Sequence, residues 1–143
     1  MSILEELRSD HDRLRAEMAA LGSDLPDADR VAAFVRDLTA HAHGEDELLF
    51  RELEKGLPAD HGPLAVMREE HEEIESRLAR IVALDPAAAE DRRDEMRRLS
   101  VVAREHFLKE EEVLFAFAER LIDAERLDDL GKLFRQQVVA ASS

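Results

Sequence analysis

The sequence contains no cysteine, tryptophan or tyrosine, and only five glycines and four prolines among its 143 residues. Without cysteine, the chain forms no disulfide, thiolate metal site or iron–sulfur cluster. No apolar run approaches the roughly 20 residues that a membrane-spanning helix needs. Residues 1–6 are acidic and amphipathic, unlike a signal peptide. We therefore expect a cytoplasmic protein that has no membrane partner.

Acidic residues, by contrast, are abundant and give the chain a formal net charge of −14. Such a surface repels the phosphate backbone of nucleic acids, so nucleic acid is not an expected partner. Alanine, leucine, glutamate and arginine are common while helix breakers are few, which favours helices over sheets. The length suggests one domain, over residues 1–143.

Hydrophobic residues recur every three or four positions in four long segments, a spacing typical of amphipathic helices. Ser2 with Glu5 forms a capping-box signal, and Pro63 suits a first helical turn. Gly22 and Gly56 are typical of helix ends. The expected helices span residues 2–21, 27–55, 63–84 and 88–121, with a shorter fifth helix over residues 124–139.

The chain is an internal duplication of a two-helix unit. The first helix aligns with the third at an offset of 60 residues, and the second with the fourth at 65. The loops are short, so neighbouring helices should be antiparallel. The predicted fold class is all-α: an up-down-up-down four-helix bundle with a short fifth helix at its C-terminus. Each unit places one histidine, and then a His-x-x-x-Glu, on its apolar stripes; the residues are His11, His41, Glu45, His71, His106 and Glu110.

These six side chains should converge inside the bundle. At 1.5 Å per residue, all four histidines lie in one central layer, with the glutamates a turn away on the same helix faces. Each unpaired buried polar group would cost on the order of 1–3 kcal/mol, and no lysine or arginine lies on these stripes. Two metal ions would resolve this, with the two carboxylates as bridges. Nitrogen and oxygen ligands suit iron, manganese or zinc, and bridging carboxylates favour iron.

Each half of the chain has one histidine followed by a His-x-x-x-Glu. With this repeated pattern, the chain resembles the hemerythrin or HHE cation-binding domain family over about residues 1–121. The resemblance implies a four-helix bundle around a non-heme, oxo- or hydroxo-bridged centre of two iron ions. It also implies the ligands: His11 and His41 for one iron, His71 and His106 for the other, and Glu45 and Glu110 as bridges.

The chain departs from the oxygen-carrying members of this family. They have a His-x-x-x-His on the third helix, whereas Met67 and Glu75 occupy the positions one turn from His71. They also have an aspartate where this chain has Glu111. Whether Glu111 also binds iron, and whether Met67 lines a ligand pocket, stays open. Four histidines and two glutamates are more similar to bacterial hemerythrin-like proteins tied to peroxide, nitric oxide, oxygen or iron handling.

The expected function is therefore binding of, or reaction with, O2, peroxide or nitric oxide at a carboxylate-bridged iron pair. Peroxide decomposition or another redox activity is left open, as is a homo-oligomer. The main alternative is an iron- or redox-sensing or iron-handling protein that uses the same site without catalysis. A metal-free bundle is a further alternative. A ferritin-like site is disfavoured because no histidine of the chain has a glutamate three residues before it.

Several other residues are expected outside the site. His43 and Glu47 lie about 160° round the helix from the apolar stripe and should be exposed. Phe50 and Phe115 lie about 180° from their histidines on a regular helix, so they should pack under the fifth helix or at an oligomer contact. Acidic residues such as Glu70 should belong to a solvated helix face.

Overall fold

The computed structural model describes residues 1–142, and its regular structure is entirely helical. Residue 143, the last of the expected domain, lies outside the described part. No helix within residues 1–142 combines the length and the apolar character needed to cross a membrane. The elements are α1 (Ile3–Ser23), α2 (Ala28–Gly44), η1 (Glu45–Phe50), α3 (Arg51–Leu53), α4 (Gly62–Val82), α5 (Ala89–Lys109), η2 (Glu110–Leu114), α6 (Phe115–Leu121) and α7 (Ala124–Ser142).

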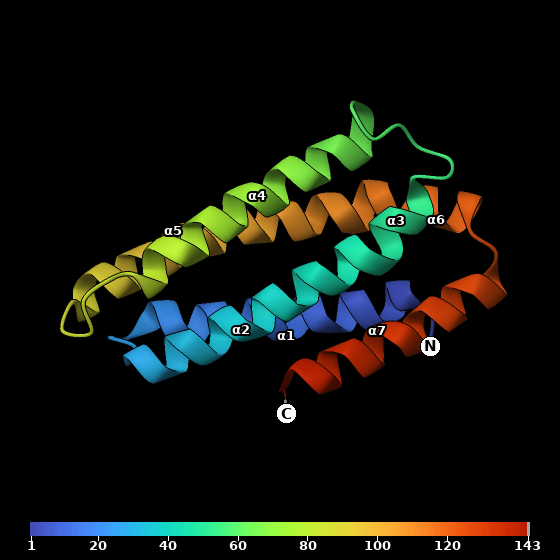
Figure 1. Ribbon diagram of the computed structural model, residues 1–143. Coiled ribbons are helices and arrows are strands. Elements are labelled where there is room, and N and C mark those ends of the chain that lie inside the picture. Colours follow the sequence, from blue (N-terminus) through green and yellow to red (C-terminus); the bar gives the residue numbers. More distant parts are fainter. Residues whose placement is uncertain (143) are drawn as a thin grey trace.

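Consecutive elements join into longer rods, because η1 and η2 are π-helical segments inside helices. The second rod consists of α2, η1 and α3, and the fourth of α5, η2 and α6. Figure 1 shows these rods lying antiparallel with α1 and α4. The predicted all-α bundle with an added C-terminal helix is confirmed.

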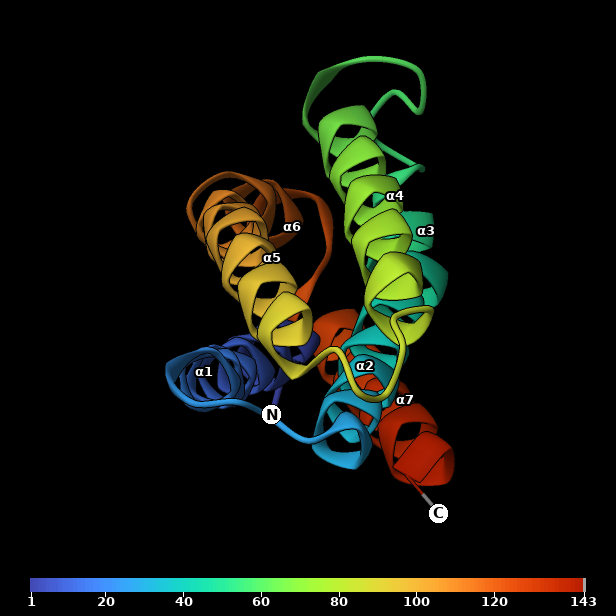
Figure 2. The same ribbon diagram turned by 90° about the vertical axis from the view of Figure 1, so that its left-hand side faces the viewer.

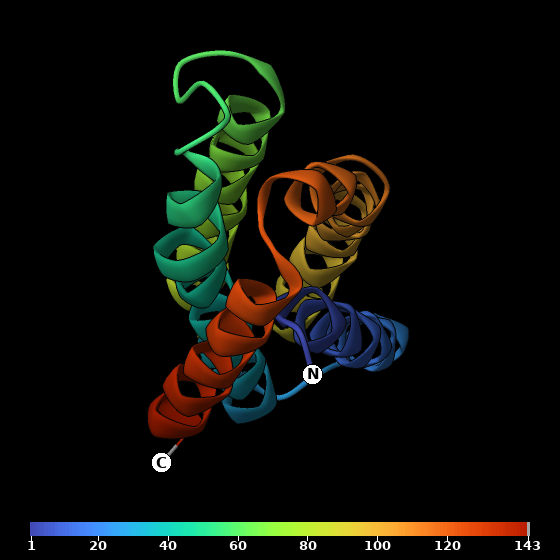
Figure 3. The same ribbon diagram turned by 90° about the vertical axis from the view of Figure 1, so that its right-hand side faces the viewer.

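The bundle has a simple order around its axis (Figure 2). Both α2 and α5 lie beside α1, and both also lie beside α4. The last helix, α7, is outside this group and packs against α1 and α2 (Figure 3). At its crossing with α1, a Cβ on Gly131 would lie 2.9 Å from the backbone nitrogen of Ile3, so the close approach of these helices needs a glycine.

Local signals in the sequence account for the helix beginnings. The Ser2 hydroxyl accepts from the Glu5 N–H at 3.3 Å, and the Glu5 carboxylate accepts from the Ser2 N–H at 3.2 Å. Asp27 caps α2 by accepting a backbone N–H three residues later, at 2.8 Å. Gly62, with a φ of 79°, turns the chain into α4, and Pro63 follows in the first turn. The caps of α1 and α2 satisfy N–H groups that lack partners in the first turn of a helix.

The buried apolar side chains form two clusters, one toward each end of the bundle, and the polar layer lies between them. Along α1, Leu7 belongs to one cluster and Leu14 to the other, with His11 between them. The same order is found along α4, with His71 in the middle position. The histidines thus share one depth, with apolar packing on both sides.

Candidate metal centre

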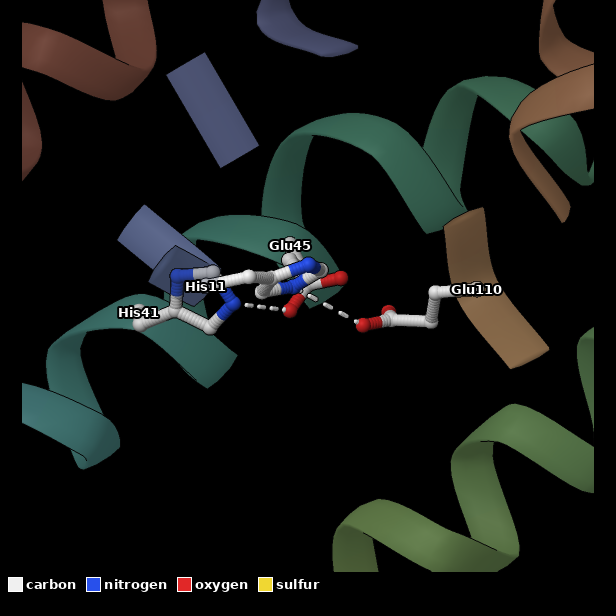
Figure 4. A group of neighbouring side chains, drawn as sticks. All are labelled: His11, His41, Glu45 and Glu110. Carbon is white, nitrogen blue, oxygen red and sulfur yellow. Dashed lines mark ion pairs between the residues drawn. The ribbon is translucent and has the colours of Figure 1, made fainter. Parts of the chain in front are cut away.

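The six residues predicted to bind metal meet in one buried layer. Each is at most 4% exposed. They form two overlapping groups, and within each group one ligand atom per residue lies within 4.8 Å of the others. The two glutamates belong to both groups, as expected of bridges. The groups are His11, His41, Glu45 and Glu110, which face one another in Figure 4, and Glu45, His71, His106 and Glu110.

The inward-facing atoms of this layer have no hydrogen-bond partners. They are the Nε2 atoms of His11, His41 and His106. They also include both carboxylate oxygens of Glu45 and of Glu110. His41 Nε2 lies 2.6 Å from a Glu45 oxygen, a close contact that lacks hydrogen-bond alignment. Buried polar atoms without partners cost on the order of 1–3 kcal/mol each. The donors are imidazole nitrogens and carboxylate oxygens, so this layer fits iron, manganese or zinc.

Each glutamate of the layer begins a π-helical segment, Glu45 in η1 and Glu110 in η2. A π-turn holds an extra residue, which rotates all later residues by about 100° around the helix. Nothing in the hydrophobic spacing had signalled these turns. Because both rods carry one at the matching position, the two halves of the site keep the same geometry.

The π-turns explain why part of the prediction for two phenylalanines was wrong. Phe50 and Phe115 share an apolar cluster with residues of α7, as expected, but they were also expected to face away from the histidines, and both lie beside the site. The ring of Phe50 stacks on His71 with centroids 4.9 Å apart. Phe115 lies nearly parallel to His11, at 6.1 Å. An added residue in the preceding turn moves each ring to the inner side of its rod.

A carboxylate from another rod supports each histidine on the side away from the centre. The contacts run from α1 to α2, from η1 to α4, from α4 to α5 and from η2 to α1, so they close a ring around the bundle. A donating Nδ1 leaves Nε2 free to face the centre, which fixes the tautomer that metal binding needs. The pairs are His11 with Glu111 at 2.7 Å, His41 with Asp10 at 3.1 Å, His71 with Asp46 at 2.9 Å and His106 with Glu70 at 2.9 Å.

Sequence reasoning missed this outer ring. Glu70 was placed on a solvated face, yet it contacts His106. The Glu111 carboxylate, whose role the sequence left open, accepts from the outer nitrogen of His11. A signal for the ring existed in the chain: each outer acid is the immediate sequence neighbour of an inner residue, as Asp10 is of His11.

The electrostatics of the layer couple its histidines to its carboxylates. Burial alone would lower the pKa of His41, but the Glu45 charge and the bond to Asp10 outweigh it and raise this pKa to about 10. Burial would also lower the pKa of His106, but the negative charge of Glu110 outweighs this effect and raises the pKa to about 9. Burial and the charge of Glu110 raise the pKa of Glu45. A metal ion must therefore displace protons from His41 and His106 at neutral pH.

Two of the residues set aside in the sequence lie where predicted. His43 and Glu47 are exposed, and Glu47 accepts a hydrogen bond from Gln137 at 3.1 Å. Met67 is 3% exposed and packs in the apolar cluster that also contains residues of α7.

Comparison with known proteins covers nearly the whole chain. The model of the hemerythrin HHE cation binding domain matches residues 2–118, a range that contains all six inner residues. A curated Nostoc protein named DNA nickase is 26% identical over 139 residues, which are 94% of this chain and 38% of that protein. The chain thus spans well under half the length of this relative. No solved structure gives a significant match.

Proposed function

The chain belongs to the hemerythrin HHE cation-binding domain family, and we propose that it is a non-heme di-iron protein that binds or reacts with O2, hydrogen peroxide or nitric oxide. The observation that carries this proposal is the set of seven buried nitrogen and oxygen atoms that face one another without hydrogen-bond partners. Two cations between them would give every one of these atoms a partner.

The inner residues have distinct roles in this proposal. Two histidines of each half would hold one iron, and the two glutamates, which belong to both ligand groups, would serve both irons. When bound, an iron pair supplies a position for a small ligand and exchanges up to two electrons with it. The ligands would be His11 and His41 for one iron, His71 and His106 for the other, and Glu45 and Glu110 for both.

The rest of the chain prepares these groups. The four outer carboxylates hold each imidazole with Nε2 inward, which orients the ligand before any metal arrives. The apolar clusters on both sides exclude water, which strengthens electrostatic interactions inside the layer. The sequence offers no tyrosine or cysteine as a proton donor. The proposal therefore covers ligand binding and simple redox reaction, peroxide decomposition included.

The nicking activity named for the Nostoc relative is not carried over to this chain. The match covers 38% of that protein, so its activity can belong to the remainder. A net charge of −14 also repels a DNA backbone.

The test is iron content together with the near-ultraviolet and visible spectrum. We expect two irons per chain and absorption bands of oxo-bridged ferric iron, easily seen because the chain lacks tryptophan and tyrosine. Bands that change on addition of peroxide, azide or nitric oxide identify the class of ligand. A protein reconstituted with ferrous iron that retains none would contradict the proposal.

A sensor that uses the same site is the second candidate, and the same seven atoms favour it. Loss of metal would leave them buried without partners and would loosen the bundle. Limited proteolysis of the iron-loaded and iron-free protein separates the candidates. Faster cleavage without iron supports a sensor, whereas equal resistance argues against one.

A further inference from the structure

Each histidine with its outer carboxylate forms what we call a corner of the site, and the four corners differ in how well they are closed. At the His71 corner, the outer carboxylate Asp46 is 36% exposed. The corresponding values are 17% for Asp10, 18% for Glu70 and 20% for Glu111. The most exposed outer carboxylate therefore supports the most exposed of the four histidines.

The His71 corner is also the most loosely held on its inner side. Its Nε2 lies 3.9 Å from the nearest oxygen of Glu45 and 3.9 Å from that of Glu110, beyond hydrogen-bond distance. The other three histidines have an inner contact between 2.6 and 3.3 Å. This imidazole consequently has one close carboxylate, the partly exposed Asp46, whereas each of the other three also has a carboxylate oxygen within 3.3 Å of its inner nitrogen.

A second difference lies in the cations around the outer carboxylates. Within residues 1–141, whose side chains the structure describes, no lysine or arginine pairs with Asp46. Each of the other three outer carboxylates has such a partner, which neutralises it and covers its corner. The partners are Arg13 for Asp10 at 3.4 Å, Arg15 for Glu111 at 3.1 Å and Lys109 for Glu70 at 2.6 Å.

The internal duplication identifies one residue that makes this difference. At the offset of 60, Arg15 matches Glu75. The Arg15 guanidinium donates to Glu111 at 3.1 Å and lies 5.6 Å from the centre of the Phe107 ring. Glu75 is exposed and carries the same charge as Asp46, so it cannot close its corner in this way.

A matched pair on the other rods adds to the effect. At the offset of 65, Phe107 matches Ala42. The Phe107 ring stacks on His11 with centroids 4.2 Å apart and an interplanar angle of 12°. Ala42 has no ring to place over His71. The His11 corner is thus covered by the Phe107 ring and an arginine, whereas the His71 corner has neither of these, and the ring that stacks on its histidine is Phe50.

The open corner faces a cavity. A space of about 250 Å³ beside His71 is lined by Asp46, Arg68, Glu72 and Glu75. Three of these are acidic, and the Arg68 guanidinium is paired with Glu54 on the other side. Negative charge lining a recess concentrates cations there. His71, a candidate metal ligand, is only 4% exposed and forms the inner wall of this acidic recess.

We propose that the two metal positions are unequal: a divalent cation enters and leaves first at the His71 position, through the cavity lined by Asp46, Glu72 and Glu75. This inference rests on the proposed function of the site. The acidic side chains attract the hydrated ion, and the bond from His71 to Asp46, whose carboxylate is the most exposed of the four, opens more easily than its three counterparts. The corner with Arg15 stays closed, so its ion leaves more slowly.

Release of ferrous iron to a coloured chelator tests this directly. The protein is loaded under argon and mixed with excess chelator; we expect two release phases of one iron each. Glu75→Arg should slow the faster phase about threefold, because the guanidinium pairs with Asp46 as Arg15 does with Glu111. Arg15→Glu should speed the slower phase, so that the phases approach each other.

Two further variants control this experiment. Glu69→Arg makes the same change in charge on an exposed part of α4, about 200° around the helix from His71, and should leave both phases unchanged. The Arg15→Glu/Glu75→Arg double variant keeps the net charge and should restore two phases. A single release phase for both irons, or equal effects of Glu75→Arg and Glu69→Arg, would overturn the inference. Failure to load two irons would instead contradict the proposed function.

Discussion

The two halves of the molecule share their inner residues and differ in what covers them. In the first half, α7 lies across α2, and the edge of its Phe134 ring meets the His41 ring at 6.0 Å and 90°. In the second half, His106 is supported by Glu70, which Lys109 contacts from solvent. The spacing of ligands within each repeat is the same, so the chemistry of the layer tolerates different surroundings.

One pair of matched residues shows how the surroundings decide the side chain. Gly44 and Lys109 correspond at the offset of 65. A Cβ on Gly44 would lie 2.6 Å from Phe134 Cε2, so the passage of α7 leaves no room there. Lys109 has no helix over it and extends to Glu70 at 2.6 Å. The position is glycine where a fifth helix covers it and a long cation where none does.

The largest expected effect comes from removing an inner ligand in either half. His41→Ala and His106→Ala should each give a helical protein that holds substantially less iron, because each loses one of two nitrogen ligands on its metal. Similar losses in the two variants would show that the inner layer is symmetric. Iron per chain, with circular dichroism for helicity, is the measurement. Two irons retained in His106→Ala would refute the ligand assignment.

The outer ring gives the next effect. Asp46→Asn and Glu111→Gln, at matched positions, should each lower iron affinity by about 10–100-fold, because the Nδ1–H of the histidine loses its charged acceptor. Competition with a chelator at equilibrium measures this. Glu112→Gln, on an exposed neighbour, is the control. If the outer carboxylates do not orient the histidines, all three variants will bind iron with the same affinity.

The third effect concerns the pH dependence of the metal-free protein. The pKa values of His41 and His106 are raised to about 10 and about 9 by the carboxylates beside them. A raised folded-state pKa gives stability that is complete below the unfolded value of about 6.5 and is lost as pH rises through 9 and 10. The free energy of unfolding should therefore fall by on the order of a few kcal/mol over this window.

Urea unfolding of the iron-free protein at a series of pH values checks this expectation. His41→Ala should flatten the upper part of the curve, near pH 10, and His106→Ala the part near pH 9. Stability that does not fall between pH 6.5 and 9 would show that these histidines are neutral in the iron-free fold.

The smallest effect should be the change in the free energy of unfolding when the contact between α7 and Gly44 is altered. Gly44→Ala introduces a methyl group against Phe134 and should destabilise the protein by about 1–3 kcal/mol. Lys109→Ala, the matched change, removes only an exposed ion pair and should cost less than about 1 kcal/mol. Urea unfolding compares the two. Equal costs would mean that α7 adds nothing to the packing of the first half.

The sequence predicted the rods and the inner site because both depend on local spacing. Caps such as Ser2 with Glu5 define helix beginnings through hydrogen bonds three residues apart. A polar residue on an apolar stripe, as at His11, must be buried wherever the stripe is buried. The duplication then places both halves at one depth.

The outer ring could not be predicted in this way. The contact of Glu70 with His106 depends on how two helices approach each other, and a face exposed in one helix can meet its neighbour. The positions of Phe50 and Phe115 depend on π-turns, which shift the faces of the rods without any change in hydrophobic spacing. These features belong to tertiary packing rather than to local pattern.

The central claim is that six buried side chains from two repeats hold a pair of metal ions, and X-ray absorption at the iron edge tests it most directly. For the protein reconstituted with iron, the account predicts only nitrogen and oxygen neighbours and a second iron at a distance of up to about 4 Å from the first. Bound iron without a second iron at that distance, or no bound iron, would contradict it.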